Sequence, residues 1–87
     1  MWYVYIARCN DGTLYTGITT NTQRREREHN LDNARGAKSL RNKRPVQIVY
    51  HERFITRGKA TKRERAIKNW GRAYKLKLIE KSKGFTL

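Results

Sequence analysis

The stretch WYVYIARCNDGTLYTGITT, residues 2–20, decides the fold. Its first part, Trp2 to Arg8, and its last part, Thr13 to Thr20, are rich in aromatic and β-branched residues, which favour strands. The intervening CNDG, residues 9–12, contains Asn, Asp and Gly, which favour turns. The stretch therefore predicts an antiparallel hairpin. Gly17, inside the second strand, indicates a bulge or a close approach by backbone or ligand.

The chain that follows the hairpin continues as a helix and a third strand. A polar helix is expected from about Gln23 to Asn33. Thr20, Asn21 and Thr22 each offer an N-cap for it, and Thr20 with Gln23 fits a capping box. Residues 34–44 are small and basic, and they predict a loop or a short helical turn. After Pro45, apolar residues of mostly one parity predict a strand from Val46 to Phe54.

Two more helices are expected at the C-terminal end. Residues 56–58 (TRG) predict a turn, and a helix from Ala60 to Trp70 follows, with Gly71 at its end. A last short helix is expected from Ala73 to Lys83. The predicted fold class is α+β, a small three-stranded antiparallel sheet flanked by helices in the order ββαβαα. We expect residues 1–87 to form a single domain, because domains typically run from about 50 to 250 residues.

The composition is strongly basic. With 21 Lys and Arg against 7 Asp and Glu, the formal net charge is +14 at pH 7. Charge of one sign repels itself in the folded state, and a polyanion is the usual compensation. Nucleic acid is the first candidate, because each neutralised phosphate releases counterions. A membrane surface is disfavoured, because the basic stretches lack the wide apolar face of an interfacial helix.

Cysteine content and hydropathy argue against a disulfide-linked, secreted or membrane-spanning protein. Cys9 is the single cysteine, so it cannot form an internal disulfide, and a reducing, cytoplasmic compartment is expected. No apolar run approaches the ~20 residues that cross a bilayer, and the opening residues show no cleavable signal. We expect no membrane partner and no small-molecule cofactor, and the oligomeric state stays open.

Glu64 is one of only two acids among twelve Lys and Arg between residues 53 and 83. It lies four residues after Ala60 and three before Ile67, on the stripe expected to face the core. One interpretation is a surface carboxylate that neutralises a neighbouring cation. The other is an inward carboxylate that stays ionised in a positive field and binds Mg²⁺ together with water and a phosphate.

Arg25 and His29 are four residues apart and share one face of the first expected helix. They are either part of a solvated basic helix that contacts phosphates or a pair aimed at one phosphate. In the second case Arg25 supplies a bidentate clamp and His29 moves a proton near neutral pH. The strand tyrosines are equally open: they either pack in the core or exchange protons in a site.

These candidates occur in a defined order along the chain. Two tripeptides, Tyr3-Val4-Tyr5 and Tyr15-Thr16-Gly17, are followed by Arg25 and His29 on the first helix and by Glu64 on a later one. The ordered set resembles the GIY-YIG nuclease superfamily over nearly the whole chain, and most of all its small single-domain members. Tyr3 replaces Gly and Thr16 replaces Ile of the founding motifs, and both motif tyrosines are kept.

The resemblance implies a metal-dependent endonuclease that hydrolyses phosphodiester bonds in DNA, weakly or with dependence on DNA structure, in repair or recombination. Glu64 would hold Mg²⁺ or Mn²⁺, weakly in the absence of substrate. Tyr5 would act as or assist the general base, and Tyr15 would orient water or a phosphate oxygen. Arg25 would stabilise charge on the phosphorus, and His29 would assist proton transfer or bind phosphate.

The nucleic-acid contacts implied with this mechanism come mainly from the basic loop and the later helix. Gly17 would let the backbone approach the reacting centre, and the flanking phosphates would be held by Lys38, Arg41, Lys43, Arg44, Arg63 and Lys68. Two alternatives remain: a basic DNA- or RNA-binding module that cuts little, and a small RNA- or ribosome-associated protein. A pure binder has no need of an inward Glu64, because a carboxylate weakens phosphate binding unless a cation intervenes.

Overall fold

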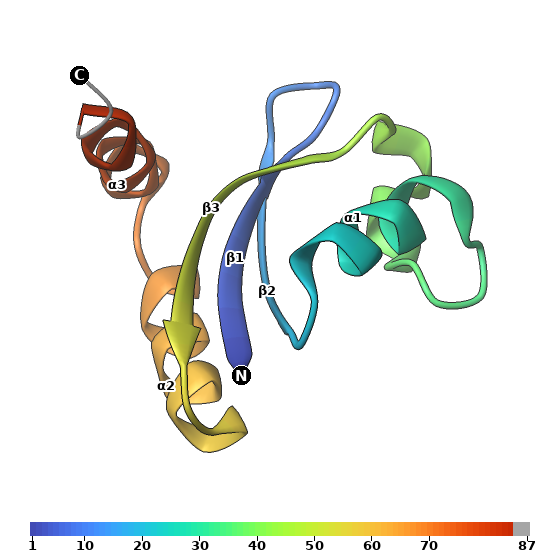
Figure 1. Cartoon of the computed structure of the whole chain (residues 1–87). Coiled ribbons are helices and arrows are strands. Elements are labelled where there is room, and N and C mark those ends of the chain that lie inside the picture. The colour runs from blue at the N-terminus through green and yellow to red at the C-terminus, as the bar shows by residue number, and fades with distance from the viewer. Residues whose placement is uncertain (85–87) are drawn as a thin grey trace.

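The computed structural model describes residues 1–84 and contains one antiparallel sheet between two groups of helices (Figure 1). The strands are β1 (Trp2–Arg8), β2 (Leu14–Thr19) and β3 (Gln47–Phe54), and they lie in the order β2-β1-β3. The first two strands form the expected hairpin, and β3 pairs with the free side of β1. The predicted α+β class and the order ββαβαα are therefore confirmed.

The helices differ from the expected ones mainly at their ends. They are α1 (Thr22–Leu31), the 3-10 helix η1 (Lys38–Lys43), α2 (Arg57–Lys68) and α3 (Arg72–Gly84). No helix of residues 1–84 is both long and apolar enough to span a bilayer.

One helix start falls on an expected cap, and another lies earlier than expected. Of the three N-cap candidates, Asn21 caps α1, because its side chain accepts a hydrogen bond from the backbone N–H of Arg24 at 2.9 Å. The turn expected at residues 56–58 is the first turn of α2, where Thr56 Oγ1 accepts from the backbone N–H of Lys59 at 3.2 Å. In both cases a capping side chain determines where the helix begins.

Strand β1 lies in the middle of the sheet and buries side chains on both faces. Successive side chains of a strand point to opposite faces. Val4 and Ile6 point to what we call the apolar face, where they meet Ala60 and Ile67 of α2 and Ile79 of α3.

The polar face is the opposite side of the sheet, which α1 and η1 cover (Figure 1). Here Tyr5 and Ala7 of β1 pack with Leu40 of η1 and with Val46. A fully buried His29 of α1 also lies on this side, against Tyr5. One strand therefore supplies an ordinary core to one face and the first candidate site residue, Tyr5, to the other.

Candidate active site

Helix α1 is held on the polar face by directed hydrogen bonds, which explains how a helix so poor in apolar residues packs. The amide of Asn30 accepts from the backbone N–H of Val46 at 2.6 Å and donates to the carbonyl of the same residue at 2.8 Å. One turn earlier, Glu26 Oε2 accepts from the backbone N–H of Ile48 at 2.8 Å. Neither Asn30 nor Glu26 stands out in the sequence as a functional residue. Their i, i+4 spacing beside a predicted strand is the only signal that could have indicated them.

The contacts of α1 place His29 against Tyr5 in the interior. The Nε2 atom of His29 lies 2.7 Å from Tyr5 Oη, and the two residues are only 0% and 1% exposed. Gly17 is the cross-strand partner of Tyr5, and a Cβ atom at Gly17 would lie 2.6 Å from the same Oη. Gly17 therefore lies at a close approach, but the group that approaches it is the phenol of Tyr5 and not the backbone or ligand expected from the sequence.

Burial determines the protonation of this pair at neutral pH. It raises the pKa of the Tyr5 phenol well above its ordinary value, and the nearby Arg25 guanidinium only partly opposes this rise. Burial and the Arg25 charge together lower the pKa of His29 to about 4. Desolvation disfavours the charged form of each group, so Tyr5 is a neutral phenol and His29 a neutral imidazole at pH 7.

Tyr15 completes an aromatic cluster with this pair. Its ring centroid lies 5.4 Å from that of His29 in an edge-on arrangement and 6.2 Å from that of Tyr5. Unlike its two partners, Tyr15 is only half-buried. It is therefore the member of the cluster that can meet a ligand without a rearrangement.

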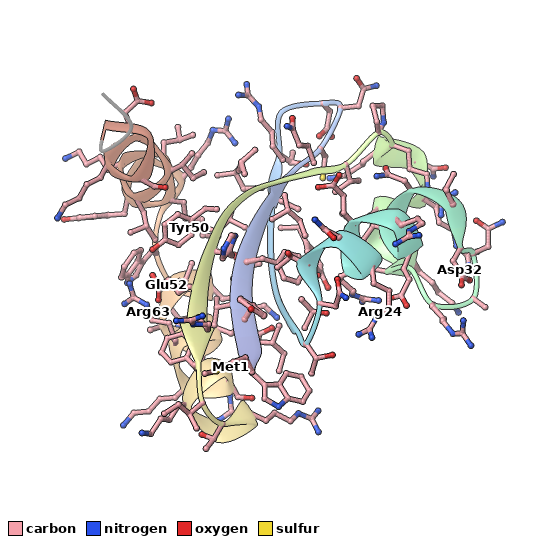
Figure 2. All side chains as sticks on the ribbon, in the orientation of Figure 1. Met1, Arg24, Asp32, Tyr50, Glu52 and Arg63 are labelled. Atoms are coloured by element: carbon pink, nitrogen blue, oxygen red, sulfur yellow. The ribbon has the colours of Figure 1, made fainter. Side chains whose placement is uncertain are left out.

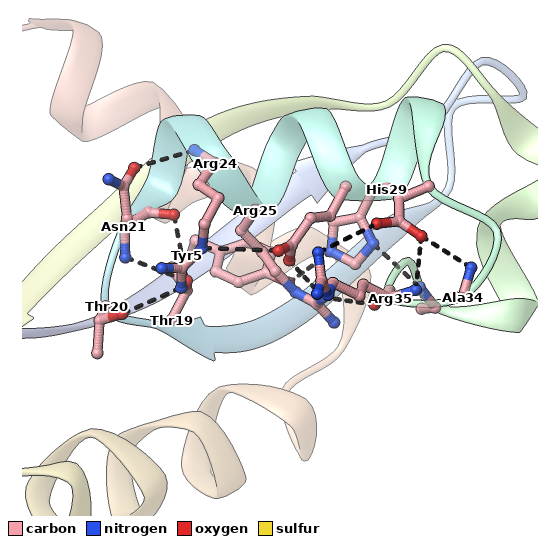
Figure 3. Close-up of polar contacts among 12 residues, drawn as sticks. Tyr5, Thr19, Thr20, Asn21, Arg24, Arg25, His29, Ala34 and Arg35 are labelled. Atoms are coloured by element: carbon pink, nitrogen blue, oxygen red, sulfur yellow. Dashed lines mark hydrogen bonds and ion pairs between the residues drawn. The ribbon is translucent and has the colours of Figure 1, made fainter.

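Arg25 lies beside the cluster and is fixed by two acceptors (Figure 3). Its Nη1 donates to Glu28 Oε1 at 3.0 Å and to the backbone carbonyl of Arg35 at 2.7 Å. The side chain keeps 23% of its surface exposed, which leaves donors of the planar guanidinium available to an anion. Glu28 cannot be recognised from the sequence as a partner of Arg25, because the contact depends on the rotamer of Arg25.

Glu64 combines features of both interpretations left open by its spacing. Its side chain is 16% exposed and forms an ion pair with Lys68 at 3.6 Å, as a neutralising carboxylate would. Its flanking positions Ala60 and Ile67 are both fully buried, as the predicted stripe requires. Its carboxylate also adds to the effect of burial in raising the pKa of Tyr5, so it lies within electrostatic range of the aromatic cluster.

The donor set suits a metal ion that takes most of its ligands from elsewhere. Among residues 1–84, no group of three or more His, Cys, Asp and Glu side chains could hold a metal ion. Glu64 is a single, partly exposed carboxylate whose ion-pair partner is a flexible lysine. Mg²⁺ is often bound by one or two carboxylates plus water and substrate phosphate, so this residue fits such an ion.

Most of the cations expected to hold phosphates make contacts within the protein. Arg63 donates twice to Glu52, at 2.9 and 3.0 Å, and lies over the ring of Trp70, so it joins α2 to β3 (Figure 2). Arg44, at the end of η1, donates from Nε to the carbonyl of His29 at 2.6 Å, which joins the chain after η1 to α1. These two arginines have a structural use that competes with phosphate binding.

The other four predicted contacts differ in how strongly they are engaged. Arg41 donates to the backbone carbonyl of Asn33, and Lys43 lies 3.6 Å from Asp11. Lys68 forms the ion pair with Glu64, while Lys38 is exposed at the start of η1. Of the six cations expected to hold phosphates, Lys38 is therefore the one most accessible to a ligand.

Comparison with known proteins identifies the group to which the chain is related. The GIY-YIG catalytic domain model matches residues 1–77. The chain belongs to the GIY-YIG family. It is 52% identical to UPF0213 protein DP2720 of Desulfotalea psychrophila over 86 residues, which is 98% of this chain and 77% of that protein.

Two further relatives support the assignment to this family. The chain is 49% identical to UPF0213 protein SSP2268 of Staphylococcus saprophyticus, over 88% of this chain and 92% of the relative. The solution NMR structure of UPF0213 protein BH0048 from Bacillus halodurans matches with a TM-score of 0.57 and 36% identity. That match covers 92% of this chain and 84% of the other. The family is one of nucleases, so nucleic acid is the expected class of substrate.

Proposed function

We propose that this GIY-YIG protein is a metal-dependent endonuclease that hydrolyses phosphodiester bonds in DNA, weakly or with dependence on DNA structure. One observation carries the proposal. Arg25 and the half-buried Tyr15 lie beside the buried Tyr5–His29 pair, and the charge of Glu64 acts on the same tyrosine. Phosphoryl chemistry uses a cation, an anion and hydroxyl groups; here the cation and the hydroxyl groups lie side by side, and the anion is within electrostatic range of them.

The most exposed members of this set would meet the substrate. Arg25 is held in place before substrate arrives, by Glu28 and by the carbonyl of Arg35, so its charge would stabilise the developing charge on phosphorus without reorganisation. Tyr15 would orient water or a phosphate oxygen through its hydroxyl. Glu64 would hold Mg²⁺ or Mn²⁺, and the bound ion would polarise the phosphate and stabilise the leaving oxygen.

The buried Tyr5–His29 pair would act indirectly, through the more exposed residues that meet the substrate. Because its pKa is raised, Tyr5 keeps its proton at neutral pH and is a weak base by itself. Of the two roles expected for it, assisting the base by hydrogen bonding is therefore favoured over accepting the proton alone.

A plasmid-nicking assay with Mg²⁺ or Mn²⁺ tests the proposal. Glu64→Gln and Arg25→Ala should each lower the nicking rate by about 100-fold or more, as loss of a transition-state charge partner does. The matched control is Glu80→Gln, which removes the other acid of the same basic region from an exposed position of α3. If wild type and the two site variants share the same residual activity, the proposal is wrong. Duplex, branched and single-stranded DNA, and RNA, are compared as substrates.

A basic nucleic-acid-binding module is the second candidate. It is favoured by the near-complete burial of Tyr5 and His29 and by the pairing of Glu64 with Lys68. A binder of this kind would bind DNA or RNA with an affinity that falls steeply with salt. Equal salt-sensitive binding by wild type, Glu64→Gln and Arg25→Ala, without metal-dependent nicking, would establish it.

A further inference from the structure

The three residues Arg35, Gly36 and Ala37, which we call the strap, return from the loop onto the last turn of α1. The backbone N–H of Gly36 donates to the carbonyl of Asp32 at 2.8 Å. The side chain of Asp32 accepts from the backbone N–H of Arg35 at 3.0 Å, which fixes the start of the strap (Figure 3). The strap therefore has a defined position relative to the helix that carries Arg25 and His29.

Gly36 is required for the strap to approach this closely. A Cβ atom there would lie 2.5 Å from the carbonyl oxygen of Glu28, 2.7 Å from that of Asp32 and 3.1 Å from the Cα of His29. The backbone of Gly36 is not in the positive-φ region, so the absence of a side chain is needed for space and not for conformation. The strap thus lies directly against the backbone of His29.

Both strap residues beside Gly36 contact a candidate site residue. The carbonyl of Arg35 accepts from Arg25 Nη1 at 2.7 Å, and the backbone N–H of Ala37 donates to His29 Nδ1 at 3.3 Å. One short segment therefore holds the guanidinium that would meet the phosphate and the imidazole that lies behind it.

The contact from Ala37 determines which nitrogen of His29 carries the proton. A backbone N–H can only donate, so Nδ1 must accept with its lone pair. A neutral imidazole has a single N–H, which then lies on Nε2, 2.7 Å from Tyr5 Oη. His29 is therefore the donor to Tyr5, and the phenolic proton of Tyr5 is left for a different acceptor.

We propose that the strap is a positioning element that fixes His29 as a hydrogen-bond donor to Tyr5 and holds Arg25 in its anion-facing orientation. In this arrangement His29 does not take the proton of Tyr5 in the resting site, because its Nε2 already carries one. The inference concerns the geometry of the site. Only its consequence for cleavage rests on the proposed nuclease function.

The experiment measures the ring nitrogens of His29 by ¹⁵N NMR at pH 7. Wild type should show a protonated Nε2 and an unprotonated Nδ1. Ala37→Pro removes the N–H that binds Nδ1 and puts the ring Cδ atom in its place, and the φ of Ala37, −63°, is within the range that proline requires. This variant should move population toward the Nδ1–H tautomer, in which Nε2 accepts from Tyr5.

Gly36→Ala tests the same element by displacing it. The matched control is Gly58→Ala, because a Cβ atom at Gly58 has no heavy atom within 4 Å. Gly36→Ala should shift the His29 nitrogen signals and the guanidinium signals of Arg25, and Gly58→Ala should leave both unchanged. His51, which is exposed on β3, gives an internal reference in every spectrum.

The outcomes separate this inference from the nuclease proposal. If wild-type His29 carries its proton on Nδ1, or if Ala37→Pro keeps the wild-type tautomer, the positioning role is wrong even if DNA is cut. Should both strap variants unfold, the wild-type tautomer alone decides. If the tautomer behaves as expected but no metal-dependent nicking occurs, the strap assignment stands and the nuclease proposal fails. If nicking occurs, Ala37→Pro should lower kcat more than it raises KM.

Discussion

The two faces of strand β1 are equally buried but are held together by different forces. On the apolar face, Val4 and Ile6 meet Ala60 and Ile67, and the contacts have no directional requirement. On the polar face, Tyr5 meets His29 through a 2.7 Å hydrogen bond. The comparison indicates that the apolar face supplies stability, whereas the polar face uses directed bonds to fix the orientation of its polar side chains.

The sharpest way to test this division is to truncate the apolar face. Ile67→Ala should lower the free energy of unfolding by about 3–4 kcal/mol, because it removes buried methyl groups and leaves a cavity. Urea unfolding followed by circular dichroism measures the loss. Ile55→Ala is the matched control, since Ile55 is 74% exposed and should change stability by less than about 0.5 kcal/mol. A cost below about 1 kcal/mol for Ile67→Ala would contradict the division.

The polar face should respond to acid where the apolar face does not. The pKa of His29 is lowered from 6.5 to about 4 in the folded state, so the unfolded chain binds the proton more readily between these values. Stability is therefore complete above pH 6.5 and falls as the pH drops toward 4, by about 2–3 kcal/mol at pH 4.5. Denaturant unfolding across this range measures the slope. His29→Gln should flatten it, and an unchanged slope in that variant would assign the effect to other groups.

A smaller effect is expected where α1 is attached to β3. Asn30→Ala leaves the N–H and C=O of the buried Val46 without the partners at 2.6 and 2.8 Å. The expected cost is about 1–2 kcal/mol, the penalty of unsatisfied buried polar groups. Thermal and urea unfolding measure it, with the exposed Asn42→Ala as the control. If both variants are equally stable, α1 is held by other contacts.

The smallest effect on stability should come from the ion pair beside the site. Lys68 is 52% exposed and lies 3.6 Å from Glu64, so Lys68→Ala should change stability by less than about 0.5 kcal/mol. The same change frees the carboxylate from a competing cation, and half-maximal nicking should then need less Mg²⁺. A requirement for more Mg²⁺ would indicate that Lys68 holds substrate instead.

The sequence predicts the fold class and the element order, because both depend on local patterns. The hairpin in residues 2–20 follows from residue propensities and turn chemistry. Tyr5, Arg25 and Glu64 can be recognised because they occur in a characteristic order along the chain. What it does not predict are partners distant in sequence. Arg63 reaches Glu52 because α2 packs against β3, and Arg44 reaches the carbonyl of His29 because the chain leaves η1 beside α1. Neither contact can be read from the local sequence.

The strap shows the same limit at shorter range. Gly36 lies in a stretch that predicts only a small, basic loop, and its contact with the backbone of α1 depends on how the loop turns back. The start of α2 was missed for a different reason, since Gly58 favours a turn by propensity but is accommodated within a helix capped by Thr56. In both places the role of a glycine, Gly36 or Gly58, depends on the atoms packed around it and not on its neighbours in sequence.

The attachment of α1 to β3 has a consequence for association between molecules. β3 is an outer strand of the sheet, and the outward backbone groups of such a strand are a template for pairing with another chain. Asn30 occupies both backbone groups of Val46, and Glu26 occupies the N–H of Ile48, with a charged side chain. An incoming strand would have to displace an amide and a carboxylate before it could bond. The contacts that mount the candidate site therefore also protect the start of this edge against edge-to-edge aggregation.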